Sequence, residues 1–372
     1  MKYPQITVII PTYNECGNIA PLVHEIESAL TTIDWAIIFV DDDSNDGTIL
    51  EIERCVNLDQ RIEGILRKGA RGLSGAVLTG LAYARSPFVA VMDADLQHDP
   101  SLIKKMLNGL EANPSKEIAL ASRYIDDYIG NGLSKTRYIG SRILTKISRL
   151  FIAKNLTDPM SGFFLVRREL FSKLSPKLST NGYKILLDLV SGLQSKNGVL
   201  EYPLIFRPRN SGESKMDFRV IWELLVIIIY RSSFSIFPRH FLSFLMIGLI
   251  GLSIHLTLLF ILFKLLGLSF AISQIIATLT AMLNNFLLNN YLTYWGNSLT
   301  GDQLVNGYLK FVCICGFGGF ISFMIATYLM SNGAIWFIAG SIGAIAAAAW
   351  NYTLTKFITW SPQRPEIIWL RR

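Results

Sequence analysis

Two carboxylates stand at the end of a hydrophobic segment, in the run Asp93-Ala94-Asp95-Leu96-Gln97. Residues 88–92 precede them and have the character of a buried strand. Ligands of open α/β sheets bind beyond the carboxyl ends of strands, and paired carboxylates suit Mg²⁺ or Mn²⁺ bound together with phosphates. Zinc would favour Cys and His ligands instead. The pattern therefore indicates either a divalent-metal site or an acidic turn, which Asp and Pro also form.

Two earlier strand-like segments also end in polar clusters. Residues 6–10 run into Pro11-Thr12-Tyr13-Asn14-Glu15, and residues 36–40 run into an Asp-rich stretch, 41–48. Apolar residues at helical spacing lie between them, over 18–30. This alternation predicts a largely parallel sheet with helices on both faces, whose polar clusters share one edge. Three clusters at one edge favour a ligand site over unrelated turns.

The composition divides the chain into two parts. Of its 372 residues 51% are hydrophobic, and the mean hydropathy of +0.37 is too high for an ordinary soluble protein. Residues 1 to about 215 mix charged and apolar side chains, whereas few charges occur between Phe241 and Lys356. We therefore expect a soluble α/β domain followed by an all-α membrane domain.

The net charge and the cysteines indicate which binding partners and which cellular setting to expect. The net charge of +7 comes from dispersed Lys and Arg residues rather than one basic block, which favours phosphate-bearing substrates and anionic lipid over nucleic acid. Cys16, Cys55, Cys313 and Cys315 form no zinc or disulfide framework, which indicates a reducing, cytoplasmic setting for the soluble part. The N-terminal residues lack the apolar core of a signal peptide, so insertion is expected from the later segments.

Taken in order, the polar clusters resemble those of the inverting family 2 glycosyltransferases of the GT-A fold. The similarity is to the branch of dolichol-phosphate mannose synthases and polyprenyl-phosphate glucosyltransferases. It covers nearly all of residues 1–216 through the further motifs Ser122-Arg123-Tyr124, Asp158-Pro159-Met160-Ser161-Gly162-Phe163, Gly182-Tyr183-Lys184 and Phe206-Arg207-Pro208-Arg209-Asn210-Ser211-Gly212-Glu213-Ser214-Lys215. The Gly-Glu-Ser-Lys segment is closer to the mannose synthases.

The resemblance implies a Rossmann-like GT-A domain that transfers a hexose from a nucleotide sugar to a polyisoprenyl phosphate, with inversion. GDP-mannose is the favoured donor, and UDP-glucose or another sugar nucleotide is the alternative. A lipid phosphate is already anionic, so positioning matters more than a strong general base. The oligomeric state is left open, with a homo-oligomer among the alternatives.

The resemblance also assigns residues. A Mg²⁺ or Mn²⁺ ion would be held by Asp93, Asp95 and Gln97, with Asp95 as the direct ligand. The alternative for Asp93 is a contact with the ribose, or with the metal through a water. The expected donor-site set is Pro11, Tyr13, Glu15, Val40, Asp42, Asp93, Ala94, Asp95, Gln97, Arg123, Arg137, Arg209 and Lys215. Its basic members would hold two phosphate groups close together. The expected catalytic residues are Asp95, Arg123, Asp158 and Arg209. Asp158 would orient the acceptor or the sugar, although a helix cap would explain it nearly as well.

The second part of the chain reads as a membrane domain over 240–360. Residues 217–239 are expected to form an interfacial helix, or alternatively a buried helix of the soluble domain. Four stretches approach the roughly 20 residues that cross a bilayer: 241–262, 270–291, 308–329 and 335–357. Arg231, Arg239, Lys356, Arg364, Arg371 and Arg372 lie at or beyond the ends of these stretches, the last three in a basic tail over 361–372. By the positive-inside rule both ends face the cytoplasm, with Lys264 as a mild exception.

Polar residues within the predicted spans suggest a further resemblance. Asn284, Asn285, Asn289 and Asn290 form a polar patch, and Asn351-Tyr352 repeats part of it. This pattern resembles the GtrA-like four-helix family associated with polyprenyl-linked sugars, and hints at a two-fold repeat of helix pairs. Bonding between helices or handling of the lipid carrier would explain the patch. Two rival functions follow: a processive polysaccharide synthase, whose Gln-x-x-Arg-Trp motif the sequence lacks, and a lipid-linked sugar flippase with a regulatory soluble part.

Overall fold

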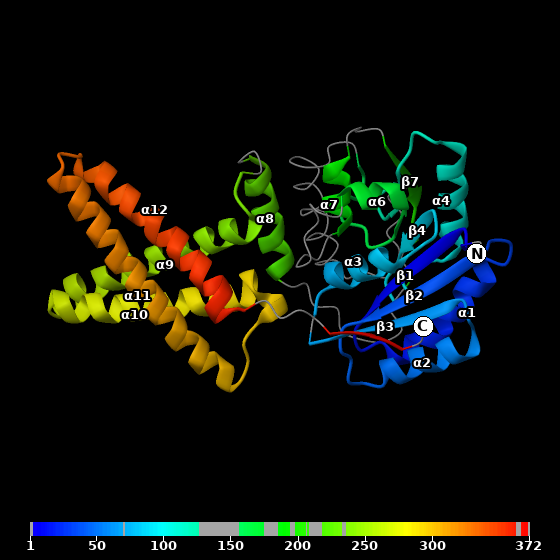
Figure 1. Ribbon diagram of the computed structural model, residues 1–372, viewed down its shortest axis with the longest axis horizontal. Coiled ribbons are helices and arrows are strands. Elements are labelled where there is room, and N and C mark those ends of the chain that lie inside the picture. The colour runs from blue at the N-terminus through cyan, green and yellow to red at the C-terminus, as the bar shows by residue number, and fades with distance from the viewer. Residues whose placement is uncertain are drawn as a thin grey trace. The chain divides into compact units, whose positions relative to one another are not determined.

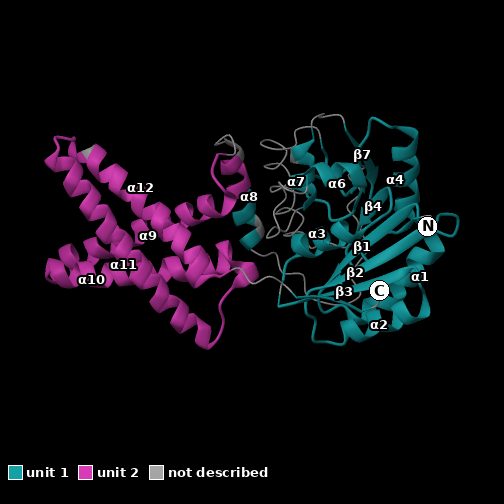
Figure 2. Cartoon of the chain, in the orientation of Figure 1, with its two compact units in different colours: residues 1–224, 364–372 teal, residues 225–363 magenta. Residues whose placement is uncertain are grey.

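The computed structural model describes residues 3–69, 71–125, 156–174, 185–193, 198–205, 207, 218–232, 236–361 and 366–370. The chain forms two compact units, Met1–Leu224 with Arg364–Arg372, and Leu225–Gln363 (Figure 2). Three expected site residues, Arg137, Arg209 and Lys215, lie outside the described residues, as do Arg364, Arg371, Arg372 and the motif at 182–184.

The first unit is built on one sheet of eight strands in the order β7-β5-β6-β4-β1-β2-β3-β8 (Figure 1). The strands are β1 (Ile6–Thr12), β2 (Trp35–Asp41), β3 (Ile62–Lys68), β4 (Phe88–Val91), β5 (Ile118–Ser122), β6 (Phe164–Arg167), β7 (Val199–Pro203) and β8 (Glu366–Trp369). The neighbours β4, β1, β2 and β3 run parallel, whereas β6 and β8 are antiparallel to the strands beside them. The predicted α/β, GT-A-like fold is confirmed.

Helices cover both faces of this sheet. One core lies against α1 (Ile19–Ala29), α2 (Thr48–Leu58) and α4 (Ser101–Ala112), and the other against α3 (Leu73–Tyr83), α6 (Arg168–Leu174) and α7 (Ile185–Gly192). Alternate residues of β1 serve the two cores, Val8 and Ile10 the first and Ile9 the second. Because β1, β2 and β4 are buried on both faces, they read as near-continuous apolar runs, which Thr7 interrupts in β1.

The strand register brings the polar clusters to one edge. β1 pairs with β2 from Ile6 opposite Trp35 to Thr12 opposite Asp41, and β4 pairs with β1 on its other side. The segments that follow β1, β2 and β4 therefore leave the sheet next to one another. This is the shared edge that the alternation of strands and helices predicted.

The chain returns to the first unit at its C-terminal end, within the stretch expected to be a basic tail. Strand β8 pairs antiparallel with β3, and the Leu370 N–H donates to the Gly64 carbonyl at 2.9 Å. Ile367 and Trp369 pack against one core and Leu370 against the other. The sequence analysis did not predict this strand, although Glu366-Ile367-Ile368-Trp369-Leu370 has strand character.

Long apolar helices dominate the second unit. They are α9 (Arg239–Phe260), α10 (Phe270–Leu288), α11 (Asp302–Ser331) and α12 (Trp336–Leu354), and α8 (Phe218–Ser232) precedes them. π-Helical turns extend three of them: Ile261–Leu265 after α9, Asn289–Thr293 after α10, and Thr355–Thr359 after α12. In the described part of the chain, three helices are long and apolar enough to cross a membrane: Arg239–Leu265, Phe270–Thr293 and Asp302–Ser331. The unit is an integral, multi-pass membrane domain, and α12 lies within the fourth predicted span.

The helices of this unit form two similar pairs, α9 with α10 and α11 with α12. In each pair a glycine faces an asparagine, Gly251 facing Asn285 and Gly318 facing Asn351, so closely that a Cβ atom would overlap the amide. The segments 285–294 and 351–360 also align, sharing Asn, Leu and Thr at equivalent positions and aromatic residues at three others. The echo in the sequence is thus part of a longer repeat.

Candidate active site

The loops after β1 and β2 are bound to each other. The Asn14 N–H donates to Ser44 Oγ at 2.9 Å, and the Glu15 N–H donates to Thr48 Oγ1 at 2.8 Å. The fully buried Asp41 carboxylate accepts hydrogen bonds from the Thr12 hydroxyl at 3.0 Å and from the Ser44 N–H at 2.8 Å. The carboxylate of Asp41 therefore holds the two loops together. The next carboxylate, Asp42, is the one placed to contact a ligand.

Asp42 is only 5% exposed and is held from two sides. Arg67 Nη1 donates to its Oδ1 at 2.7 Å, and the Gly72 N–H donates to its Oδ2 at 2.6 Å. Burial raises the pKa of Asp42 to about 6, although Arg67 and the Gly72 N–H act in the opposite direction. Arg67 was not among the predicted site residues. Two adjacent buried carboxylates need a cation nearby. That requirement was the signal that could have pointed to a basic residue on the neighbouring strand.

The other expected nucleoside residues surround this edge. Pro11 and Val40 are buried register partners on β1 and β2, so they form part of the floor. Tyr13 is 41% exposed, with the Arg71 guanidinium 4.7 Å from its ring centre. Glu15 accepts a hydrogen bond from Asn18 Nδ2 at 2.6 Å, which orients its carboxylate.

The segment after β4 turns sharply through Leu96, whose φ is 61°. Asp95 is buried, and its Oδ1 accepts from the Gln97 N–H at 3.2 Å. Gln97 Nε2 donates to the Arg207 carbonyl at 3.0 Å, so the amide oxygen is the half of this side chain suited to a metal. The Asp93 side chain is 39% exposed, while Ala94 is buried in the core.

The donor atoms of this segment fit a hard divalent cation. In the described ranges no three or more His, Cys, Asp or Glu side chains gather into a metal-binding group. The expected set, Asp93, Asp95 and Gln97, offers only carboxylate and amide oxygens. Such a partial set suits Mg²⁺ or Mn²⁺, because Mg²⁺ is commonly held by one or two carboxylates together with waters and substrate phosphates.

The backbone before β6 passes directly against Asp93. A Cβ atom on Gly162 would lie 2.8 Å from Asp93 Oδ2. Behind the carboxylate lies His98, whose ring stacks on Phe163 with 5.1 Å between ring centres and whose Nδ1 accepts from the Asp93 N–H at 3.3 Å. Burial holds the pKa of His98 below its ordinary value, even though Asp93 and Asp95 pull it upward. His98 is a packing support that the sequence analysis did not single out.

Arg123 and Asp158 form a bidentate ion pair, in which the Asp158 side chain is fully buried and the Arg123 side chain is 20% exposed. Arg123 Nε donates to Asp158 Oδ2 at 2.7 Å, and Nη2 donates to Oδ1 at 2.9 Å. Burial alone would lower the pKa of Arg123, but the attraction and hydrogen bonds of Asp158 hold it above its ordinary value. Asp158, fully buried, orients the guanidinium instead of capping a helix. The contact with Arg123 explains the buried carboxylate without a helix cap, and the catalytic role expected of Asp158 stays a prediction.

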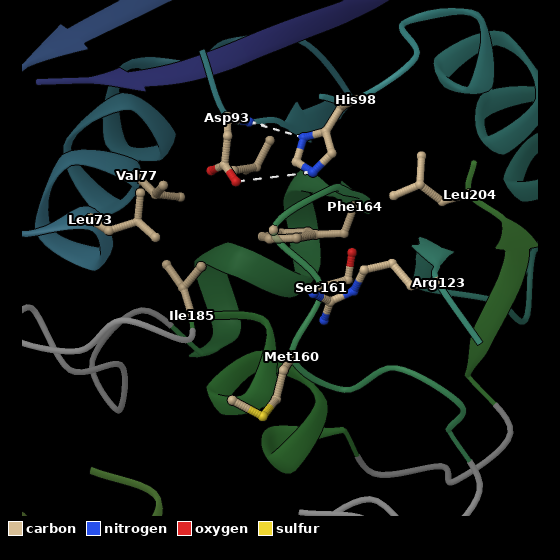
Figure 3. A pocket seen from close by; sticks show the side chains of 12 residues that line it. Leu73, Val77, Asp93, His98, Arg123, Met160, Ser161, Phe164, Ile185 and Leu204 are labelled. Atoms are coloured by element: carbon tan, nitrogen blue, oxygen red, sulfur yellow. Dashed lines mark hydrogen bonds and ion pairs between the residues drawn. The ribbon is translucent and has the colours of Figure 1, made fainter. Parts of the chain in front are cut away.

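Asp93 and Arg123 line one small cavity of about 100 Å³ (Figure 3). Apolar side chains from α3, β4, β6 and α7 make up much of its wall. The cavity is lined by Leu73, Val77, Val91, Asp93, His98, Arg123, Met160, Ser161, Gly162, Phe164, Ile185 and Leu204. A carboxylate and a permanently charged guanidinium thus face one partly apolar space, which suits a phosphate group between a metal and an arginine.

Comparisons with known proteins agree with this geometry. Residues 7–175 match the family model "Glycosyl transferase family 2", and residues 243–360 match "GtrA/DPMS, transmembrane domain". Over 362 residues the chain is 31% identical to a dolichol-phosphate mannosyltransferase of Pyrococcus furiosus, covering 96% of this chain and 99% of that protein. A dolichol-phosphate mannosyltransferase of Mycosarcoma maydis is 34% identical over 266 residues, which are 68% of this chain and 87% of that one.

Among solved structures, the UDP complex of glucosyl-3-phosphoglycerate synthase from Mycobacterium tuberculosis is similar with a TM-score of 0.47 and 18% identity, over 61% of this chain and 80% of that one. The fold and the site define a membrane-bound glycosyltransferase with a GT-A-like catalytic domain. The chain belongs to glycosyltransferase family 2 and is a dolichol-phosphate mannosyltransferase-like enzyme with a GtrA/DPMS transmembrane domain. Both resemblances stated from the sequence are confirmed.

Proposed function

We propose that this enzyme transfers mannose from GDP-mannose to the phosphate of a polyisoprenyl lipid, with inversion, at the cytoplasmic face of a membrane. The observation that carries the proposal is the meeting of Asp93 and the Asp158-bound Arg123 in one cavity. The nearly full-length similarity to a dolichol-phosphate mannosyltransferase supports mannose and a lipid phosphate as the substrates.

The donor nucleotide is proposed to lie along the edge formed by β1, β2 and β4. Asp42 would accept hydrogen bonds from the base, above the floor formed by Pro11 and Val40. Tyr13 and Glu15 would border the ribose. The diphosphate would then reach Asp93, Asp95 and Gln97, which would hold Mg²⁺ or Mn²⁺; when bound, the ion offsets the charge that develops on the departing diphosphate.

The acceptor needs orientation more than deprotonation. Its phosphate oxygen forms the bond to the anomeric carbon, while the bond to the donor diphosphate breaks and GDP leaves with the electron pair. Attack from the side opposite the leaving group inverts the anomeric configuration. Arg123 carries a permanent positive charge in a fixed orientation, so it can hold one phosphate against the repulsion of the other. Arg137, Arg209 and Lys215 are proposed to add to this positive charge, on the resemblance alone.

The C-terminal strand supports four membrane spans. β8 belongs to the sheet of the first unit, although the membrane unit separates it from that unit in the sequence. If the first unit stays on one side of the bilayer, residues 225–363 cross it an even number of times. This count requires α12 in addition to the three long helices. The basic residues outside the spans then support a cytoplasmic orientation.

The test is lipid labelling by the purified full-length protein. We expect chloroform-extractable radioactivity from labelled GDP-mannose with a polyprenyl phosphate and Mg²⁺ or Mn²⁺. Label from UDP-glucose alone would replace the donor assignment, and label from neither would overturn the proposal. Asp95→Asn should abolish the product while leaving the unfolding temperature and membrane insertion unchanged. Product formation that survives this change would favour the flippase alternative.

A further inference from the structure

Arg67 lies near the end of β3 and is only 6% exposed. It is a buried cation beside the sheet edge where the nucleotide sugar is proposed to bind. Its Nη1 contacts both Asp42 Oδ1 at 2.7 Å and the Gly72 carbonyl at 3.3 Å. The Gly72 N–H holds the other oxygen of Asp42. Among the described residues, each carboxylate oxygen thus accepts from one protein donor, which leaves a lone pair on each for a ligand.

The charges around Asp42 explain why a cation is needed there. Asp41 lies next to it, fully buried, and repels its negative charge. Burial already raises the pKa of Asp42 to about 6, and Arg67 provides the main attraction that opposes the rise. Removing Arg67 would move this pKa further upward, so a larger share of Asp42 would be protonated at neutral pH. A protonated carboxyl loses an acceptor and presents an O–H donor instead.

The orientation of Arg67 is set by its strand. β3 lies between β2 and β8, and Arg67 pairs with Ile367 of β8 while Lys68 pairs with Glu366. The pairing with β2 ends at Leu66 opposite Asp41, one residue before Arg67, so the backbone at Arg67 itself is held by β8.

We propose that Arg67 is a positioning residue for donor recognition, which fixes Asp42 as a double acceptor for a base edge with two adjacent N–H donors. Guanine has such an edge at N1–H and N2–H, whereas uracil has one N–H between two carbonyls. The inference rests on the proposed function in one respect, the placement of the base against Asp42. Arg67 itself acts through Asp42.

The test is calorimetric binding of GDP with Mg²⁺ to the full-length protein between pH 5 and 8.5. In the wild type, affinity should fall as the pH drops through about 6, because Asp42 becomes protonated. Asp42→Asn should lose the part of this pH dependence that comes from Asp42. Any dependence that remains in this variant then measures the titration of GDP itself. Arg67→Met should weaken binding about ten-fold at pH 7 and move the midpoint upward. Arg67→Lys keeps the positive charge but loses the planar guanidinium. Its pH midpoint for binding should therefore be close to that of the wild type, and most of the affinity should remain.

Two controls separate positioning from folding. Arg61→Met removes an arginine from an exposed ion pair with Asp59 and should change neither affinity nor midpoint. In the double variant Asp42→Asn/Arg67→Met, the further loss caused by Arg67→Met should vanish, because Arg67 has no other route to the base. If Arg67→Met does not fold, the same cycle is run with Arg67→Lys. The smaller affinity loss that Arg67→Lys causes in the wild type should then vanish in the Asp42→Asn background.

The outcomes distinguish this inference from the proposed function. Wild-type binding with an affinity and midpoint that the Arg67 variants leave unchanged overturns the role of Arg67 alone. An Arg67 effect that persists in the double variant also overturns it, because the arginine would then act independently of Asp42. Wild-type binding of UDP with no binding of GDP overturns both the guanine preference and the GDP-mannose assignment.

Discussion

At the scale of single residues, the charges of the site are held by partners within the protein. Thr12 and Ser44 hold Asp41, Arg67 holds Asp42, and Asp158 holds Arg123. Donors and charges that are oriented before the substrate arrives need little reorganisation during reaction. We therefore expect small steric changes beside these groups to affect transfer more than stability.

Gly162 offers such a change. Gly162→Ala would place a methyl group against Asp93 Oδ2, at a distance that carboxylate and carbon do not tolerate. We expect the transfer rate to fall at least about ten-fold, because misplacement of a catalytic group by about 1 Å can cost a factor of about 100. Gly17→Ala is the matched control, since a Cβ there meets no atom within 4 Å. Equal rates for the two variants in the lipid-labelling assay would contradict the close approach.

The Arg123–Asp158 pair makes a prediction about stability. Asp158→Ala leaves the largely buried guanidinium of Arg123 without its partner, which should cost about 3 kcal/mol in the free energy of unfolding, the lower end of the range for buried pairs. Asp59→Ala breaks the exposed pair with Arg61 and should cost about 1 kcal/mol or less. Denaturant unfolding of the two variants measures the difference. Similar losses would show that the buried pair is not a structural element of the site.

The residue scale also shows how far sequence reasoning reaches. Asp42, Asp93 and Asp95 follow strands in local motifs, and their edge of the sheet follows from the alternation of strands and helices. Arg67 could not be placed in the same way, because its partner lies 25 positions earlier in the chain and only the pairing of β2 with β3 brings them together. The role of Asp158 likewise depended on a contact across 35 positions with Arg123.

At the scale of elements, β8 covers the edge of β3. An open strand edge exposes unpaired N–H and C=O groups, and β8 covers it with Ile367 and Trp369 packed on one core and Leu370 on the other. Trp369 also meets Tyr83 of α3 edge to face, at 4.8 Å between ring centres. Strand β8 is thus part of the catalytic unit.

Ending the chain at residue 365 should therefore damage the catalytic unit. We expect a lower unfolding temperature and, because β3 carries Arg67, weaker binding of GDP. Removing residues 371–372 alone leaves β8 in place and serves as the control. The measurements are thermal unfolding and calorimetry on the same detergent preparations. Unchanged nucleotide affinity after loss of β8 would disconnect this strand from the donor site.

The glycines of the membrane helices provide a second element-scale test. Gly251→Val should separate α9 from α10 by displacing Asn285, and Gly318→Val should do the same to α11 and α12 at Asn351. Gly248→Val and Gly319→Val are matched controls on the same helices, because a Cβ at either position meets nothing within 4 Å. We expect only the first two variants to lower the unfolding temperature in detergent. Equal effects at all four positions would indicate a general cost of valine.

At the scale of the whole molecule, topology connects the two units through the sequence. The sequence alone predicted four spans from apolar stretches, and three of them are long, apolar helices among the described residues. It did not reveal that the chain returns to the catalytic sheet, because a strand of four residues carries a weak local signal and its partner is 298 positions away, at Lys68 opposite Glu366. Because β8 belongs to the catalytic sheet, the chain is predicted to cross the membrane an even number of times.

The number of crossings can be measured by labelling single introduced cysteines from either side of oriented vesicles. In a variant without the four native cysteines, Leu266→Cys and Asn332→Cys lie between successive helices and should react with an impermeant maleimide only from the non-cytoplasmic side. Ser298→Cys and Ser361→Cys should react only from the cytoplasmic side, because residue 298 follows two crossings and residue 361 follows four, so both return to the side of the catalytic unit. Reaction of positions 332 and 361 from the same side would mean that α12 does not cross. The enzyme would then span the membrane three times, and β8 could not reach the sheet of its own chain.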